Sequence, residues 1–272
     1  MFKDISFGQY YPSNSLLHRL DPRFKIILTL VLIIGVFVAD GVFSLGFSIL
    51  FCALLLLLSK IPVLTVLKNT KPLIPIILLT FILNLIYVGG DTVLFKLWKF
   101  TLTAESLEIA VFIAIRIVLL VIVTSFLTYT TTPTDLTAAI ESLLKWLRVF
   151  KIDVHSIAMM MTIALRFIPT LIDEINKIIN AQKARGADFD SGNVFKRFKA
   201  MVPVLIPLFI SSFRRAYELA NAMECRCYNG GSGRTKLKQM KASARDFAAL
   251  SMVAIFLCGV ILLNLLKIGG IG

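Results

Sequence analysis

Long apolar runs alternate with short polar breaks along most of the chain. Five of them approach the roughly 20 residues that a helix needs to cross about 30 Å of hydrocarbon. These runs cover residues 24–39, 42–59, 72–88, 105–130 and 247–266. The first is short, but Arg23 and Lys25 can extend their charged ends to the membrane surface. The pattern therefore predicts five transmembrane helices.

A different pattern fills the stretch between the fourth and fifth runs, where apolar residues recur at helical spacing opposite polar ones. It predicts three consecutive amphipathic helices, which begin near Leu136, Ile157 and Met201. The second, if continuous to Arg185, would be about 43 Å long, with a kink at Pro169. We expect the apolar upstream parts of the second and third helices to be buried or to lie at the interface. The alternative is that they form a sixth and a seventh span.

The composition agrees with a membrane protein. Hydrophobic residues make up 57% of the 272 positions and charged residues only 17%, against about 45–50% and about 25% in soluble domains. A water-soluble enzyme is thereby excluded. We predict an all-α polytopic membrane protein with about five transmembrane helices and three amphipathic cytoplasmic helices. Its parts are residues 1–130, 131–245 and 246–272.

The charge distribution indicates an orientation. The formal net charge is +13, and 18 basic against nine acidic residues lie between Thr134 and Arg245. Basic residues also flank the first run and follow the second. Because Lys and Arg are retained on the cytoplasmic side, a cytoplasmic N-terminus and an external C-terminus are predicted.

The chain offers little that resembles a catalytic or metal centre. Its four cysteines and two histidines lack the spacing of a zinc site, and no Ser-His-Asp set or paired catalytic carboxylates stand out. The glycine-rich stretch at 230–235 lacks the Lys of a phosphate-binding loop, so a flexible linker is the simpler interpretation. We expect no catalytic residues, no metal and no cofactor in this chain.

Two helix ends are the most informative feature. The second amphipathic helix ends in Ala184-Arg185-Gly186, and the third ends in Cys225-Arg226-Cys227. Arg is favoured at a helix C-terminus by the helix dipole, and Gly186 is a typical C′ residue, so simple capping is one interpretation. The other is docking, in which small neighbours let a guanidinium enter a groove and pair with a carboxylate. Repetition of the motif, on tips expected to point to the same side, favours docking.

These motifs give the chain a recognisable appearance. It resembles the transmembrane T component of energy-coupling factor transporters, in the ATP-binding cassette superfamily, whose mark is a pair of X-Arg-X motifs ending two coupling helices. An N-terminal segment at residues 11–25 and the Arg-x-x-Pro at residues 166–169 also match, and the resemblance covers essentially the whole chain. The departure is the pair of Cys residues around Arg226, where Ala and Gly are common.

The resemblance implies a non-catalytic coupling subunit in a prokaryotic plasma membrane. Each arginine would dock on one of two cytoplasmic ATPases, which bind ATP and Mg, and the helices would pass their motion to a small substrate-binding membrane subunit for vitamin or metal-ion uptake. Apolar faces would contact that subunit, although such faces often pack on their own protein. Candidate contacts are Met160, Ile168, Ile172, Ile175, Ile179, Phe209 and Phe213.

Other functions remain as alternatives. A membrane enzyme acting on lipid or isoprenoid phosphates would use the basic stretch as a phosphate clamp, but no acidic metal-binding motif faces it. A secondary carrier would show an internal repeat, and none is found. Arg116 lies in the middle of the fourth run, where a charge is costly, so we expect a buried partner, with Glu108 and Asn84 as candidates.

Overall fold

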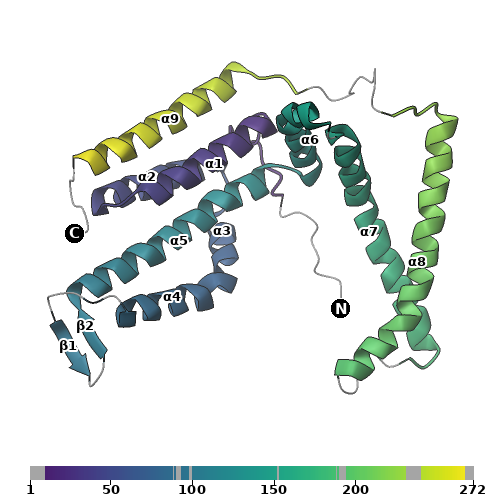
Figure 1. Ribbon diagram of the computed structural model, residues 1–272, viewed down its shortest axis with the longest axis horizontal. Coiled ribbons are helices and arrows are strands. Elements are labelled where there is room, and N and C mark those ends of the chain that lie inside the picture. Colours follow the sequence, from purple (N-terminus) through teal and green to yellow (C-terminus); the bar gives the residue numbers. More distant parts are fainter. Residues whose placement is uncertain are drawn as a thin grey trace. The chain divides into compact units, whose positions relative to one another are not determined.

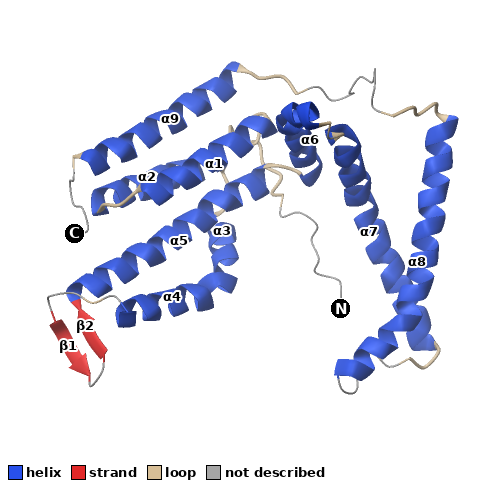
Figure 2. Cartoon of the chain, viewed as in Figure 1, coloured by secondary structure: helices blue, strands red, loops and turns tan. Residues whose placement is uncertain are grey.

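A computed structural model of the chain describes residues 10–87, 89, 93–97, 100–151, 153–187, 189, 194–230 and 240–266. These residues form helices and one short hairpin (Figures 1 and 2). The all-α fold expected from the sequence is confirmed. Two units can be distinguished: one contains α1 to α5 and α9, and the other contains α6, η2, α7 and α8.

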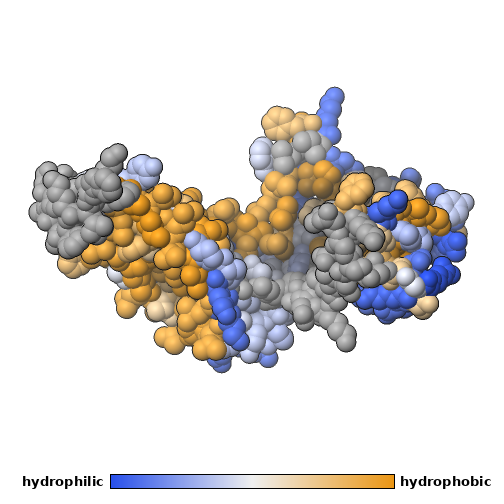
Figure 3. Space-filling model, turned by 90° about the horizontal axis from the view of Figure 1, so that it is seen from below, coloured by the Kyte–Doolittle hydropathy of each residue, from blue (hydrophilic) through white to orange (hydrophobic). Residues whose placement is uncertain are grey.

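The first unit is built around four helices: α1 (Pro22–Val38), α2 (Val42–Ser59), α5 (Ala104–Thr130) and α9 (Ala244–Leu265). They share one cluster of buried apolar side chains, among them Val36, Cys52, Val123 and Phe256. In the space-filling view, orange apolar side chains cover most of the visible surface of this unit (Figure 3). An apolar exterior around an apolar core is what a helix bundle in lipid requires.

Close packing joins α1 and α9. Gly35 faces the ring of Phe256, and a Cβ at that glycine would lie 2.7 Å from the ring, so only Gly fits there. At the other end, the Asp246 carboxylate caps α9 and accepts the backbone N–H of Asp21 at 2.8 Å. Since Asp21 is the N-cap of α1, both helices begin at the same end of the unit.

The third predicted span begins earlier than the sequence indicated. Residues expected to form a loop before Pro72 are helical: α3 covers Val63–Thr70, η1 covers Lys71–Leu73, and α4 covers Ile74–Tyr87. The basic residues Lys68 and Lys71 suggested a loop, but helices accommodate Lys at their C-terminal turns. The predicted end of this span, Val88, lies outside the described residues.

A β-hairpin between α4 and α5 was not predicted. Strands β1 (Val93–Leu97) and β2 (Phe100–Thr103) pair antiparallel, with Leu97 opposite Phe100 and a register shift between Val93 and Phe95. Thr103 ends the second strand and also caps α5, since its hydroxyl accepts the N–H of Ser106 at 3.2 Å. The hairpin thus leads directly into the longest helix of the first unit.

Five helical segments are long and apolar enough to cross a membrane: Val42–Ser59, Val63–Tyr87, Ala104–Thr130, Val154–Ala184 and Ala244–Leu265. A multi-pass membrane protein with about five spans is therefore confirmed. The membership of the set differs from the prediction, however. The 17-residue α1 is shorter than these five because Asp40 and Gly41 end it, whereas α7 qualifies through its apolar upstream half.

The second unit contains the predicted amphipathic helices. The first of them divides into α6 (Pro133–Leu143) and the 3₁₀ segment η2 (Leu144–Phe150). The other two are α7 (Val154–Ala184), which continues through Pro169, and α8 (Val194–Cys225), which contains Pro203 and Pro207. Figure 1 shows α8 bending near its start, where these prolines remove backbone donors from the helix.

Candidate functional site

The two long helices of the second unit pack antiparallel. Near the C-terminal end of α7, the Gln182 side chain donates to the carbonyl of Pro203, early in α8, at 3.5 Å. Near the start of α7, Met159 Sδ accepts from the Tyr228 hydroxyl, just beyond the end of α8, at 3.1 Å. The helix that follows α7 in the chain thus runs back along it (Figure 1).

This arrangement corrects one expectation. The tips carrying Arg185 and Arg226 were expected to point to the same side, but they lie at opposite ends of the helix pair. Met159, which marks the α8 tip, is 26 residues before Arg185, or about 40 Å along a helix. Two sites so far apart suit two separate partners better than a single groove.

The tip of α7 ends in a Schellman motif. Its C-cap is Arg185, and Gly186 follows with a left-handed φ of 86°. The N–H of Gly186 donates to the carbonyl of Lys183 at 3.0 Å, and the N–H of Ala187 donates to that of Gln182 at 3.0 Å. These two bonds are the pattern that defines this type of helix ending.

The tip of α8 repeats the same geometry. Arg226 follows the last helical residue, and Cys227 has a left-handed φ of 56°. The N–H of Cys227 donates to the carbonyl of Glu224 at 2.9 Å, and that of Tyr228 donates to Met223 at 3.0 Å. Each X-Arg-X motif therefore presents its arginine at the C-cap of a Schellman motif.

Both arginines are available for binding. All six residues of the motifs are exposed: Ala184, Arg185, Gly186, Cys225, Arg226 and Cys227. Among the described residues, neither guanidinium makes a hydrogen bond or an ion pair. The backbone bonds of each motif already close the helix, so capping does not require the side chain, which extends into solvent.

A polar contact that the sequence analysis missed holds α7 and α8 together. Glu174 accepts a hydrogen bond from the Ser211 hydroxyl, and Arg215 Nη2 lies 2.7 Å from the same carboxylate. Both residues lie opposite the apolar stripes of their amphipathic helices, and they contact each other across the helix pair. Their opposite charges on consecutive amphipathic helices were the signal that could have predicted this contact.

The predicted apolar contacts fall into two groups. Met160, Phe209 and Phe213 have relative exposures of 61%, 60% and 73%. The four isoleucines are half-buried: Ile168, Ile172, Ile175 and Ile179. On α8, Val202, Ile206 and Tyr217 are also exposed and continue the row of Phe209 and Phe213 at helical spacing. This exposed row is large for a surface without a partner or lipid against it.

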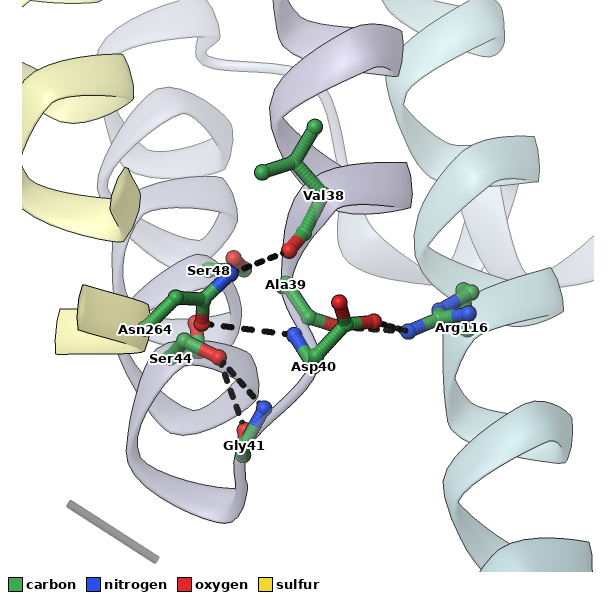
Figure 4. A network of polar contacts seen from close by, with 8 residues as sticks. All are labelled: Val38, Ala39, Asp40, Gly41, Ser44, Ser48, Arg116 and Asn264. Atoms are coloured by element: carbon green, nitrogen blue, oxygen red, sulfur yellow. Dashed lines mark hydrogen bonds and ion pairs between the residues drawn. The ribbon is translucent and has the colours of Figure 1, made fainter. Parts of the chain in front are cut away.

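Arg116 lies in a polar network within the first unit (Figure 4). It donates to the carbonyl of Ala39 and pairs with the Asp40 carboxylate at 3.4 Å, and Phe112 lies under its guanidinium at 4.8 Å. From α9, Asn264 donates to the carbonyl of Val38 and accepts the N–H of Asp40 at 3.4 Å. The expected structural pairing is present, but its partners are these and not Glu108 or Asn84.

Comparison with known proteins agrees with this picture. The family model of CbiQ, described as cobalt transport protein, matches residues 13–237. The energy-coupling factor transporter transmembrane protein EcfT of Ruminiclostridium cellulolyticum is 51% identical over 264 residues, which cover 97% of this chain and 98% of the relative. The proteins of the same name from Clostridium kluyveri and Bacillus subtilis are 49% and 42% identical, covering 95% and 92% of this chain and 96% and 94% of theirs.

Identity at this level over nearly the whole chain extends beyond the short motifs to the spans and the helices between them. Both X-Arg-X motifs lie inside the matched residues. The chain therefore belongs to the family of energy-coupling factor transporter transmembrane proteins.

Proposed function

We propose that the chain couples ATP hydrolysis in two cytoplasmic ATPase subunits to the movement of a small substrate-binding membrane subunit. Membership in the family makes the chain a transmembrane component of a multi-subunit transporter. The observation that supports a link to two ATPases is the pair of equivalent exposed arginines. Arg185 lies at one end of the antiparallel α7–α8 pair, and Arg226 lies at the other. Each guanidinium would pair with a carboxylate in a groove of its own ATPase.

The helix pair is suited to transmitting motion. Its two helices are fixed to each other by Glu174, Ser211 and Arg215, so a displacement of either tip moves both. The exposed apolar row around Phe209 and Phe213 would then carry the substrate-binding subunit. In this scheme ATP and Mg are bound by the ATPases, this chain performs no catalysis, and the substrate is a vitamin or a metal ion. With a cytoplasmic N-terminus in a prokaryotic plasma membrane, both tips would be cytoplasmic if α7 lies outside the membrane, although its length and composition would also let it span.

A pull-down with charge-reversal variants tests the proposal. The double variant Arg185→Glu and Arg226→Glu should remain in the membrane but lose both ATPases and uptake. Because the tips lie at opposite ends, each single variant should lose one ATPase contact and keep the other. Removing one partner of a buried charge pair costs about 2–5 kcal/mol, so each loss should be visible in co-purification.

The control changes the same charges away from the tips. Lys199 and Arg214 are exposed on α8, and Lys199→Glu with Arg214→Glu reverses two charges on the same helix pair. This control should co-purify both ATPases and retain uptake. Wild-type uptake by the tip double variant would contradict the docking role, and so would equal losses in the control.

A further inference from the structure

We propose that the first unit binds the acyl chain of an anionic phospholipid in a cavity between α1, α2, α5 and α9. The cavity has a volume of about 280 Å³. Its walls are almost entirely apolar and include Leu28, Leu55, Phe126, Ala249 and Met252. An engineered apolar cavity of about 150 Å³ stays dry and binds benzene, so a cavity of this size and chemistry favours hydrocarbon over water.

The lining of the cavity selects the kind of occupant. Its almost entirely apolar walls suit a flexible acyl chain, and the exposed Arg245 at its border suits an anionic headgroup. The exposed residues Leu16 and Arg245 border the cavity, so it opens to the surface where α1 and α9 begin.

Two cations line the cavity, and one of them is exposed at its mouth. Lys25 lines it and is 7% exposed, and its ammonium donates to the carbonyls of Thr130 at 2.7 Å and His18 at 3.2 Å. Arg245 also lines it and, among the described residues, makes no hydrogen bond or ion pair. The carboxylates of Asp21 and Asp246 are engaged in capping α1 and α9. A phosphate at the mouth would therefore meet the exposed guanidinium of Arg245 above a cavity for its tail.

An anionic phospholipid combines these two features in one molecule. The positive-inside pattern places this end of the unit at the cytoplasmic leaflet, which is rich in anionic headgroups. Each basic side chain near such a surface contributes enough for about a fivefold change in affinity. Arg245 should therefore determine the headgroup preference, and the apolar walls should determine retention of the acyl chain.

Native mass spectrometry of the full chain in mild detergent tests both parts. Phosphatidylglycerol and phosphatidylcholine with identical acyl chains are the probes. Wild type should retain phosphatidylglycerol preferentially, and Arg245→Gln should reduce that preference about fivefold. The matched control Lys241→Gln changes a nearby exposed cation that does not line the cavity, and its preference should equal that of wild type. An unchanged preference in Arg245→Gln would overturn the assignment of the headgroup.

Filling the cavity tests whether it binds the acyl chain. Ala249→Phe places a ring in the cavity and should abolish retention, whereas Ala254→Phe makes the same change on an exposed face of α9 and should not. Phosphatidylglycerol with a photoreactive acyl chain provides a measurement on the unchanged protein, and its cross-links should map to Leu28 or Met252. Equal retention by the two Phe variants, or cross-links confined to residues outside the cavity, would overturn the proposal.

Discussion

Gly186 and Cys227 occupy the same position in two copies of one helix ending. Both have left-handed φ values, 86° and 56°, and both donate their N–H to the carbonyl three residues earlier. Glycine adopts this conformation without steric cost, but for cysteine it costs roughly 1–2 kcal/mol. The chain maintains the geometry at its second tip with a less suitable residue, so the position of Arg226 depends on the turn and not on the identity of residue 227.

Replacement of the cysteine should therefore stabilise the tip. Cys227→Gly should gain up to about 1 kcal/mol in the last turn of α8 while binding of the ATPase is retained. Slower hydrogen exchange at the N–H of Tyr228 would report the gain. The matched control is Cys225→Gly, which puts glycine at the last helical residue and should cost about 0.3 kcal/mol, because Cys is itself a weak helix former. Faster exchange in the first variant would contradict the role assigned to the turn.

The contact between Glu174 and Arg215 should stabilise the helix pair. The side chain of Arg215 is 39% exposed and that of Glu174 is 18% exposed, so solvent screens the attraction between their charges. We expect a coupling free energy of about 1 kcal/mol in a double-mutant cycle with Gln at each position. Uptake should fall in Glu174→Gln while both ATPases remain bound, because the tips are unchanged. Glu218→Gln, on an exposed position of α8, is the control and should leave uptake unaltered.

The stability of the network around Arg116 should depend more on the hydrogen bond to the Ala39 carbonyl than on the ion pair with Asp40. Ala39 is 1% exposed, so its carbonyl loses a buried hydrogen bond in Arg116→Gln, at a cost of about 1–3 kcal/mol. The Asp40 side chain is 80% exposed, and Asp40→Asn should cost well under about 1 kcal/mol. Thermal unfolding of the full chain in detergent measures both. Equal destabilisation by the two variants would show that the ion pair is the main contribution.

Acidification should destabilise the N-terminal arm through His18. Its ring donates to the Tyr11 carbonyl at 2.9 Å and lies 2.7 Å from the Ser15 hydroxyl. Burial lowers the pKa of His18 below its usual value near 6.5, and the charge of Lys25 adds to that effect.

The sign of the pH effect follows from this direction. The unfolded chain binds the proton at higher pH than the folded chain does, so stability is complete above about pH 6.5 and decreases as the pH falls through the folded-state pKa. Between pH 8 and pH 5, the unfolding temperature of wild type should decrease more than that of His18→Gln. A parallel decrease in the two proteins would show that other groups cause the loss.

The sequence predicted a span well where a long apolar run was interrupted by polar residues on both sides. The boundaries of α2 match the predicted run because Asp40-Gly41 and Lys60 interrupt apolar sequence on both sides. The prediction failed for α3, because the lysines of this stretch suggested a loop. It also failed for the hairpin formed by Val93–Leu97 and Phe100–Thr103. Such short strands carry too few residues for alternation to be distinguished from irregular structure.

The positions of the two helix ends were predicted from the sequence, but their spatial arrangement was not. Small residues around Arg185 and Arg226 identified both tips, since a motif is local. Their placement at opposite ends is a property of tertiary packing, which a helical stripe does not encode. The same holds for Glu174, whose partner is 41 residues away on the next helix. Periodicity gives the face of a helix but not the direction of its neighbour.

The bond between the Asp246 carboxylate and the N–H of Asp21 joins residues 225 positions apart. During synthesis, α1 therefore leaves the ribosome long before the helix that completes its packing. Until α9 emerges, the Gly35 face of α1 has only lipid or an insertion factor to cover it. A chain that stops before Ala244 would keep both tips yet leave this face open, and cellular quality control would encounter it as an unfinished protein.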